Sequence, residues 1–317
     1  MNYLTLFLKG MAMGAADVVP GVSGGTIAFI TGIYERLLNA IKSVNPATVK
    51  LLFKEGFAAA WEKVDGTFLL VLFAGIATSI FSLAKALSWC METYPQLLWA
   101  FFFGLIIASA IYVVKQVERW TPAAIIGLIA GAAVAYIITL ISPTEASTAP
   151  WMVFLAGAIA ICAMILPGIS GSFILLLMGM YKHVLNAATD RDIVFLGTFM
   201  VGCVAGLLAF SHVLSWTFKN FRNTTLAVLA GFMIGSLNKV WPWQNVLKLR
   251  INSHGEQVPW IMQNTSPDGY NGDAYLFACL ALSVLGFGVV FLLEKFGSQE
   301  PDTKPESWNK NEDVLDS

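Results

Sequence analysis

The chain has 317 residues, of which 57% are hydrophobic and only 12% are charged, and its mean hydropathy is +0.69. Too few polar side chains are present to cover a water-soluble particle of this size, so the composition excludes a soluble globular protein and predicts an all-α integral membrane protein. The formal net charge of −1 indicates no class of partner, and a nucleic-acid partner is not expected.

The first stretch, MNYLTLFLKGMAMGAADVVPG, does not read as a signal peptide, because its apolar run is short, contains Lys9 and leads into a glycine-rich motif. After this motif come stretches of about twenty mainly apolar residues, the length needed to cross a hydrocarbon core roughly 30 Å thick. These predicted spans lie at 66–90, 97–114, 122–141, 192–217, 224–237 with its apolar flanks, and 274–293.

The glycine-rich motif occurs twice. Residues 20–40 read PGVSGGTIAFITGIYERLLNA, and residues 167–187 read PGISGSFILLLMGMYKHVLNA. Pro20 and Pro167 are 147 positions apart, and the similarity continues downstream at an offset of 127, at which Gly75 meets Gly202. The chain is therefore predicted to contain two repeats, 1–141 and 142–294, followed by a polar tail, 295–317, that we expect to be disordered in the cytoplasm.

Each repeat is predicted to hold a broken or re-entrant helix hairpin followed by three transmembrane helices. Whether the hairpin re-enters the membrane or crosses it twice, it adds an even number of crossings, so each repeat crosses an odd number of times. The two repeats are then inverted relative to each other. Inverted repeats with broken helices are the architecture of secondary transporters, whose binding sites lie near the midplane.

Basic residues indicate the orientation, because cytoplasmic loops carry more lysine and arginine than outer loops. One side of the predicted topology collects Lys9, Lys42, Lys50, Lys54, Lys63, Lys115, Arg119, Lys219, Arg222 and Lys295. The other side collects Lys182, Arg191, Lys239, Lys248 and Arg250. Both termini are therefore predicted to lie in the cytoplasm.

Each motif interrupts helical, apolar sequence. Proline and glycine remove backbone hydrogen bonds, and bare amides in hydrocarbon cost several kcal/mol unless protein, water or ligand satisfies them. An apolar helix begins directly after each break, so its free N–H groups and positive dipole end predict a site for an anion such as a phosphate. The alternative is that the small residues only permit a kink or a tight helix crossing. The candidate binding residues are Gly21, Ser23, Gly24, Gly25 and Thr26 in the first motif, and Gly168, Ser170, Gly171 and Ser172 in the second.

Four titratable residues complete the candidate site. Asp17 lies three residues before Pro20, where an ionised carboxylate is costly unless paired or hydrated. It is predicted to bind a coupling ion or proton, or alternatively to cap local amides. Lys85 and His212 occupy equivalent positions in the two repeats and either attract an anionic headgroup or reach toward the interface. Arg36 either anchors the first motif helix at the interface or receives a headgroup on the cytoplasmic side.

No cofactor, metal site or catalytic residue is predicted. The four cysteines, Cys90, Cys162, Cys203 and Cys279, lie scattered in apolar segments without metal-ligand spacing. Small packing residues are the interpretation that fits this distribution.

The two motifs resemble the signature of the bacterial polyprenyl-phosphate transporter family, formerly an uncharacterised membrane domain family. The segments that carry the resemblance are MGAADVVPGVSGGTIAFITGIYERLL and LPGISGSFILLLMGMYKHVL, and the likeness extends to about residue 294. It implies a flippase that returns undecaprenyl phosphate, the carrier lipid of peptidoglycan and cell-wall synthesis, to the inner leaflet of the bacterial cytoplasmic membrane. The implied site positions are Asp17, Pro20, Gly21, Ser23, Gly24, Gly25, Thr26, Pro167, Gly168, Ser170, Gly171 and Ser172.

Two other functions stay open at this point. A membrane lipid phosphatase also uses breaks rich in proline, glycine and serine, but it needs a nucleophile or acid–base pair and a cation close to the phosphate. Glycine follows each motif serine, at Gly24 and Gly171, and neither motif contains arginine before its helix. A small-anion transporter would use the same helix-start chemistry as a lipid-phosphate transporter. The expected partners are a polyprenyl phosphate and membrane lipids, and a homo-oligomer stays open.

Overall fold

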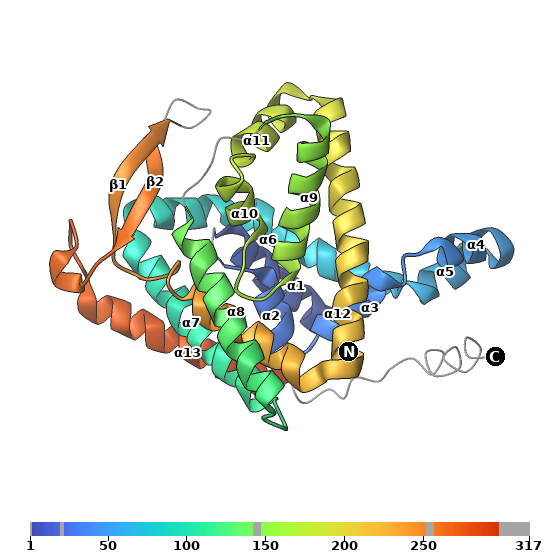
Figure 1. Cartoon of the computed structure of the whole chain (residues 1–317), viewed down its shortest axis with the longest axis horizontal. Coiled ribbons are helices and arrows are strands. Elements are labelled where there is room, and N and C mark those ends of the chain that lie inside the picture. The colour runs from blue at the N-terminus through green and yellow to red at the C-terminus, as the bar shows by residue number, and fades with distance from the viewer. Residues whose placement is uncertain (1, 20–21, 142–146, 252–256, 298–317) are drawn as a thin grey trace.

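The computed structural model describes residues 2–19, 22–141, 147–251 and 257–297 (Figure 1). Within these residues the chain is a bundle of apolar α-helices with one two-stranded sheet at its edge. The predicted helical membrane architecture is therefore confirmed at this level. The sheet is an element that the sequence analysis did not predict.

The helices follow one another in the same order in the two predicted repeats: a helix, a break, a short helix, another helix, and then long apolar helices. The first segment contains α1 (Tyr3–Val18), α2 (Gly24–Ile30), α3 (Tyr34–Lys42), α4 (Pro46–Glu55), α5 (Phe57–Lys63), α6 (Gly66–Thr93), α7 (Pro95–Lys115) and α8 (Pro122–Leu140). The second contains α9 (Pro150–Ile165), α10 (Gly171–Leu177), α11 (Tyr181–Asp190), α12 (Ile193–Ser236), β1 (Gln244–Ile251), β2 (Gln257–Asn264), the 3-10 turn η1 (Pro267–Gly269) and α13 (Leu276–Gly297).

Four helices in the described part of the chain are long and apolar enough to cross a membrane: α6, α7, α8 and α12. The shorter helix α9 and residues Leu276–Leu292 of α13 are also apolar. The two spans predicted at 192–217 and 224–237 run together in α12, which has a non-helical backbone at Phe221 (φ −138°, ψ 44°). Figure 1 shows the yellow and orange parts of α12 running in different directions, so this helix supplies two segments.

Large apolar side chains cover the outside of the bundle. Ile126 and Ile129 of α8, Val201 of α12, and Phe277 and Val284 of α13 are each more than half exposed. A soluble monomer rarely exposes so many large apolar side chains on its long helices. Together with the long apolar helices, this surface indicates a multi-pass membrane protein.

Corresponding glycines bring corresponding helices together in the two segments. Gly75 of α6 lies against the Phe7 carbonyl of α1, and a Cβ atom at Gly75 would overlap that oxygen. Gly202 of α12 lies in the same way against the Phe154 carbonyl of α9. Gly202 is 127 positions after Gly75, and Phe154 is 147 positions after Phe7, the two offsets of the repeat. The same pairs of positions therefore touch in both segments.

A second pair of contacts joins the two segments to each other. Gly131 of α8 lies against the Val228 carbonyl of α12, and Gly286 of α13 lies against the Phe101 carbonyl of α7. Val228 is again 127 positions after Phe101. The second part of α12 thus packs on α8 as α7 packs on α13. In each of these two contacts, one helix comes from the first segment and the other from the second.

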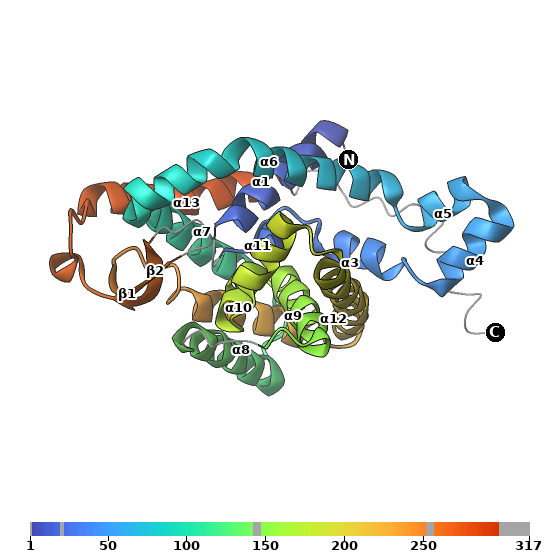
Figure 2. The same ribbon diagram turned by 90° about the horizontal axis from the view of Figure 1, so that it is seen from above.

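Two polar additions project from opposite ends of the helical bundle (Figures 1 and 2). The change of offset from 147 to 127 marks an insert in the first segment, residues 43–64, which forms α4 and α5, separated by Gly56 with a φ of 90°. The loop after α12 forms the antiparallel hairpin β1–β2, in which Gln244 pairs with Asn264. The predicted tail begins inside α13, which extends to Gly297, and residues 298–317 lie outside the described residues.

Candidate functional site

The first motif is closed by side chains of its own repeat. Helix α2 begins at Gly24, whose N–H group donates to Oδ1 of Asp17 over 2.7 Å. The N–H group of Gly25 donates to Oγ of Ser23, the N-cap residue, over 3.1 Å. Asp17 therefore caps the start of α2, as one of its two sequence interpretations proposed. Its predicted role in coupling is a separate matter and stays a prediction.

Lys9 occupies the other end of the same short helix. Its Nζ donates to the carbonyl oxygen of Thr31, the C-cap residue of α2, over 2.8 Å. Helix α1 thus places a carboxylate at the positive end of α2 and an ammonium at the negative end, the arrangement that a helix dipole favours. The sequence analysis used Lys9 as evidence against a signal peptide and as a marker of topology, and it missed this contact.

The two motifs touch each other. Ser23 donates through Oγ to the carbonyl of Met164 over 3.0 Å, and the N–H group of Gly168 donates to Oγ1 of Thr26 over 3.1 Å. Gly25 lies so close to the carbonyl of Ile165 that a Cβ atom would overlap it. Ser23 and Thr26 are buried, at 1% and 0% exposure, so these bonds form in the interior between the two breaks.

The second motif has the same backbone but different side-chain chemistry. Helix α10 also spans seven residues, and its N-cap, Ser170, makes no side-chain capping bond in the described structure. Instead Oγ of Ser170 and Oγ of Ser172 are 2.9 Å apart. Met164 and Ala156 stand where the first repeat has Asp17 and Lys9. The charges that close the first break therefore have no counterpart at these positions in the second.

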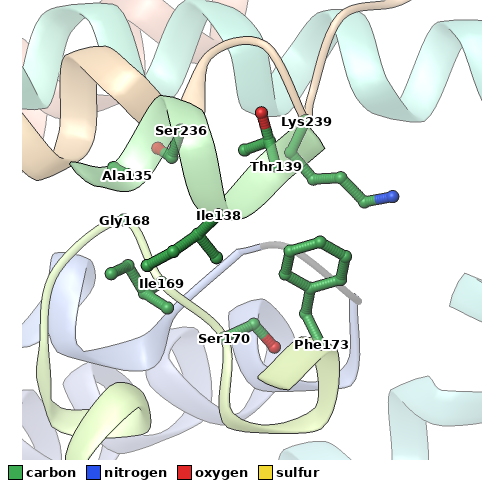
Figure 3. A pocket seen from close by; sticks show the side chains of 9 residues that line it. All are labelled: Ala135, Ile138, Thr139, Gly168, Ile169, Ser170, Phe173, Ser236 and Lys239. Atoms are coloured by element: carbon green, nitrogen blue, oxygen red, sulfur yellow. The ribbon is translucent and has the colours of Figure 1, made fainter. Parts of the chain in front are cut away.

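A small pocket adjoins the second motif (Figure 3). Figure 3 shows Ile138 and Ile169 meeting in its middle, with Ser170 on the opposite side from Thr139 and Ser236. The pocket is lined by Ala135, Ile138, Thr139, Gly168, Ile169, Ser170, Phe173, Ser236 and Lys239. Its wall therefore combines apolar contacts with three hydroxyl groups and one cation.

Lys239 lies in the turn after α12, and its side chain extends across the ring of Phe173 (Figure 3). Nζ lies 4.7 Å from the ring centroid. Burial lowers the pKa of the Lys239 amino group from its ordinary value, because desolvation penalises the charged form. The sequence analysis placed Lys239 in an outer loop and missed its position beside the motif. Its distance in sequence from Phe173 leaves no local pattern that could reveal the contact.

The remaining candidates lie on other elements. Arg36 of α3 forms a two-pronged ion pair with Asp65, with Nε–Oδ2 at 2.6 Å and Nη2–Oδ1 at 3.1 Å. Its guanidinium carbon also lies 4.4 Å from the ring centroid of Phe68. His212 is exposed on α12, and its Nδ1 is 2.7 Å from the carbonyl oxygen of Leu208. The described contacts thus assign Arg36 a structural partner and give His212 no contact with either motif.

Three further candidates fall partly or wholly outside the described structure. Pro20 and Gly21 are not among the described residues. Lys85 lies in α6, but its side chain is outside the described part. Their predicted roles stay predictions.

The fold and the paired motifs define a class: a multi-pass helical membrane protein with two contacting polar breaks inside an apolar bundle. The sequence comparisons narrow this class. The family model described as VCA0040-like, undecaprenyl phosphate translocase-like, matches residues 13–258. The chain belongs to this family.

Two curated relatives are similar over most of their length. A protein of Vibrio cholerae serotype O1 named "Polyprenyl-phosphate transporter" is 48% identical over 303 residues, covering 94% of this chain and 98% of the relative. A protein of the same name from Staphylococcus aureus is 32% identical over 253 residues, covering 74% of this chain and 85% of the relative. The resemblance stated from the motifs is thereby confirmed. No solved structure gives a significant match.

Proposed function

We propose that the chain transports undecaprenyl phosphate, or a closely related polyprenyl phosphate, between the leaflets of the bacterial cytoplasmic membrane. The observation that carries this proposal is the direct contact between two polar breaks inside an apolar bundle. Such breaks are tolerated at membrane depth only where protein or a polar ligand satisfies the freed backbone groups. The names of the two relatives supply the substrate class.

An inverted repeat is the architecture that we propose for this transporter. Its support is the correspondence of contacts: Gly75 with Phe7 matches Gly202 with Phe154, at the offsets of the sequence repeat. In an inverted repeat the two motifs meet near the midplane as re-entrant or broken helices. Rocking of one repeat against the other would then change the leaflet to which the site opens.

The lipid phosphate would be bound by the amides and hydroxyl groups of the motifs, while the polyprenyl chain stays in lipid. Because Asp17 already accepts the N–H of Gly24, a phosphate must compete with this carboxylate at the first break. Neutralising or moving Asp17 would favour the phosphate, which gives Asp17 a route to coupling. At the second break the matching residue is Met164, so no carboxylate competes from that position.

The proposed role is transport without chemical change of the lipid, in recycling the carrier lipid of cell-wall synthesis. Both termini would face the cytoplasm. The structure places α4–α5 and the β1–β2 hairpin at opposite ends of the bundle, which supports assigning them to opposite sides of the membrane (Figures 1 and 2).

A reconstituted system tests the motif residues. Liposomes would contain undecaprenyl phosphate and either wild-type chain or the double variant Ser23→Ala/Ser170→Ala, with thermal unfolding measured to match folded protein. We expect the double variant to lose most lipid translocation, because both hydroxyl groups lie in the breaks. If the double variant translocates the lipid as fast as the wild type, the two motif hydroxyl groups are not needed for transport. Release of inorganic phosphate would instead indicate a phosphatase.

A further inference from the structure

We propose that Lys239 and the hydroxyl-lined pocket beside the second motif bind the phosphate group of the transported lipid. This inference rests on the proposed function and adds to it a cation beside the second break. The site is built by three parts of the chain that are distant in sequence: the end of α8, the second motif and the turn after α12. A phosphate monoester is the ligand that an ammonium group at the edge of a pocket with hydroxyl groups in its wall would recognise.

Lys239 forms no ion pair with any carboxylate in the described residues. Its described partner is the ring of Phe173. Lys239 is half-buried, so its ammonium is partly removed from water without an anion, and a cation–π contact offsets only part of that cost. Charge-assisted hydrogen bonds to a phosphate are stronger than this contact, so an arriving phosphate can displace the ring.

The backbone on both sides of Lys239 is held in place. The carbonyl of Lys239 accepts a bond from Nε2 of Gln244 over 2.8 Å, and its N–H group donates to the Ser236 carbonyl over 2.9 Å. The neighbouring Asn238 donates to Oγ1 of Thr139 over 2.6 Å and accepts from Asn264 over 2.8 Å. The ends of the β1–β2 hairpin thus fix the turn that presents the lysine, which gives the hairpin a role in the site.

Hydroxyl groups surround the same space. Thr139, Ser170 and Ser236 line the pocket, and Ser172 contacts Ser170 through their Oγ atoms. The pocket has room for about one water molecule, so a phosphate requires Lys239 and Phe173 to separate. These two side chains lie on different elements and are joined by the cation–π contact alone among their described contacts.

The matching positions of the first repeat lack this arrangement. Tyr112 stands 127 positions before Lys239, and Thr26 stands 147 positions before Phe173. The first repeat instead carries Asp17 at its break. One repeat therefore holds a carboxylate at its break and the other a cation, which assigns phosphate binding to the second repeat.

Equilibrium binding by the full-length purified chain tests this assignment. The probes are undecaprenyl phosphate, undecaprenol and inorganic phosphate, and the variants are Lys239→Gln and Lys248→Gln. Lys248 is an exposed lysine of β1, so its variant removes the same charge from the same region. We expect Lys239→Gln to reduce the preference for the phosphorylated lipid over the alcohol by about tenfold or more, and Lys248→Gln to leave it unchanged.

A measurement on the wild-type chain covers the case in which Lys239→Gln does not fold. Acylation of lysine amines, located by mass spectrometry, should be slowed at Lys239 by undecaprenyl phosphate and not by undecaprenol. Equal acylation with the two lipids, or an unchanged phosphate preference in folded Lys239→Gln, would overturn the assignment. If inorganic phosphate displaces undecaprenyl phosphate when the two are present at equal concentration, the site binds free phosphate and not the lipid headgroup. A wild-type chain that does not distinguish the two lipids would instead contradict the proposed function.

Discussion

Asp17 and Lys9 show how single residues make the two motifs unequal. Both lie on α1; Asp17 accepts from the first N–H group of α2, and Lys9 donates to the carbonyl of its C-cap residue, Thr31. Their counterparts, Met164 and Ala156, cannot do so for α10. The motifs look alike in sequence because the glycine, proline and serine positions repeat, whereas the charges that distinguish them, Asp17 and Lys9, lie before the first motif.

The capping bond of Asp17 predicts a loss of stability on substitution. Asp17→Ala leaves the N–H of Gly24 without its acceptor in a buried environment, at a cost of about 1–3 kcal/mol. Thermal unfolding of the purified chain in detergent measures this change, with Asp17→Asn as the matched variant because its amide oxygen can still accept the bond. Equal unfolding temperatures for the wild type and Asp17→Ala would contradict the capping role.

The coupling role of Asp17 predicts a different effect on transport. Asp17→Asn removes the titratable charge while keeping an acceptor at Gly24, so we expect a folded protein whose transport rate no longer varies with pH as the wild type does. The measurement is the initial rate of lipid translocation in liposomes over a series of pH values. Full retention of the pH-dependent rate in Asp17→Asn would leave Asp17 as a cap alone.

The sequence predicted the candidate residues within the motifs, but it did not predict their contacts with residues distant in sequence. Ser23, Gly168 and Ser170 were singled out because their pattern repeats, and Thr26 because its hydroxyl lies beside the repeated residues. Lys239 was missed because only the fold brings it to Phe173.

At the scale of elements, substitution of the glycines at the helix contacts is expected to destabilise the packing within each repeat. Gly75→Val and Gly202→Val place side-chain atoms against the carbonyls of Phe7 and Phe154, so the helices must separate. We expect each variant to lower the yield of folded protein and its unfolding temperature. Gly197→Val is the control: Gly197 lies on α12, as Gly202 does, and a Cβ atom there would have no neighbouring atom within 4 Å. Similar losses in all three variants would show that valine in these helices, and not the contact, is responsible.

The apolar helices were predicted well because their length and composition are set by the membrane. The stretches 66–90, 97–114 and 122–141 became α6, α7 and α8 with ends within a few residues. The helices of the 43–64 insert and the β1–β2 hairpin were not predicted. These elements lie outside the apolar segments, where hydropathy gives no signal, and the hairpin depends on contacts such as that of Gln244 with Lys239.

At the scale of the whole molecule, the orientation predicts which labels reach which side. Single cysteines at Lys54 of α4 and Lys248 of β1, in a chain whose four native cysteines are replaced, should be labelled from opposite sides of the membrane. We expect Lys54→Cys to react with a membrane-impermeant reagent only after cell rupture and Lys248→Cys in intact spheroplasts. Labelling of both positions from one side would contradict the proposed topology.

The central claim is that the chain moves a lipid phosphate between leaflets and leaves it chemically unchanged. The most direct measurement follows the leaflet distribution of undecaprenyl phosphate over time in liposomes with and without the wild-type chain, together with release of inorganic phosphate. The proposed function predicts redistribution that depends on the protein, no phosphate release, and no comparable movement of undecaprenol. Phosphate release, or a leaflet distribution that the protein does not change, would contradict it.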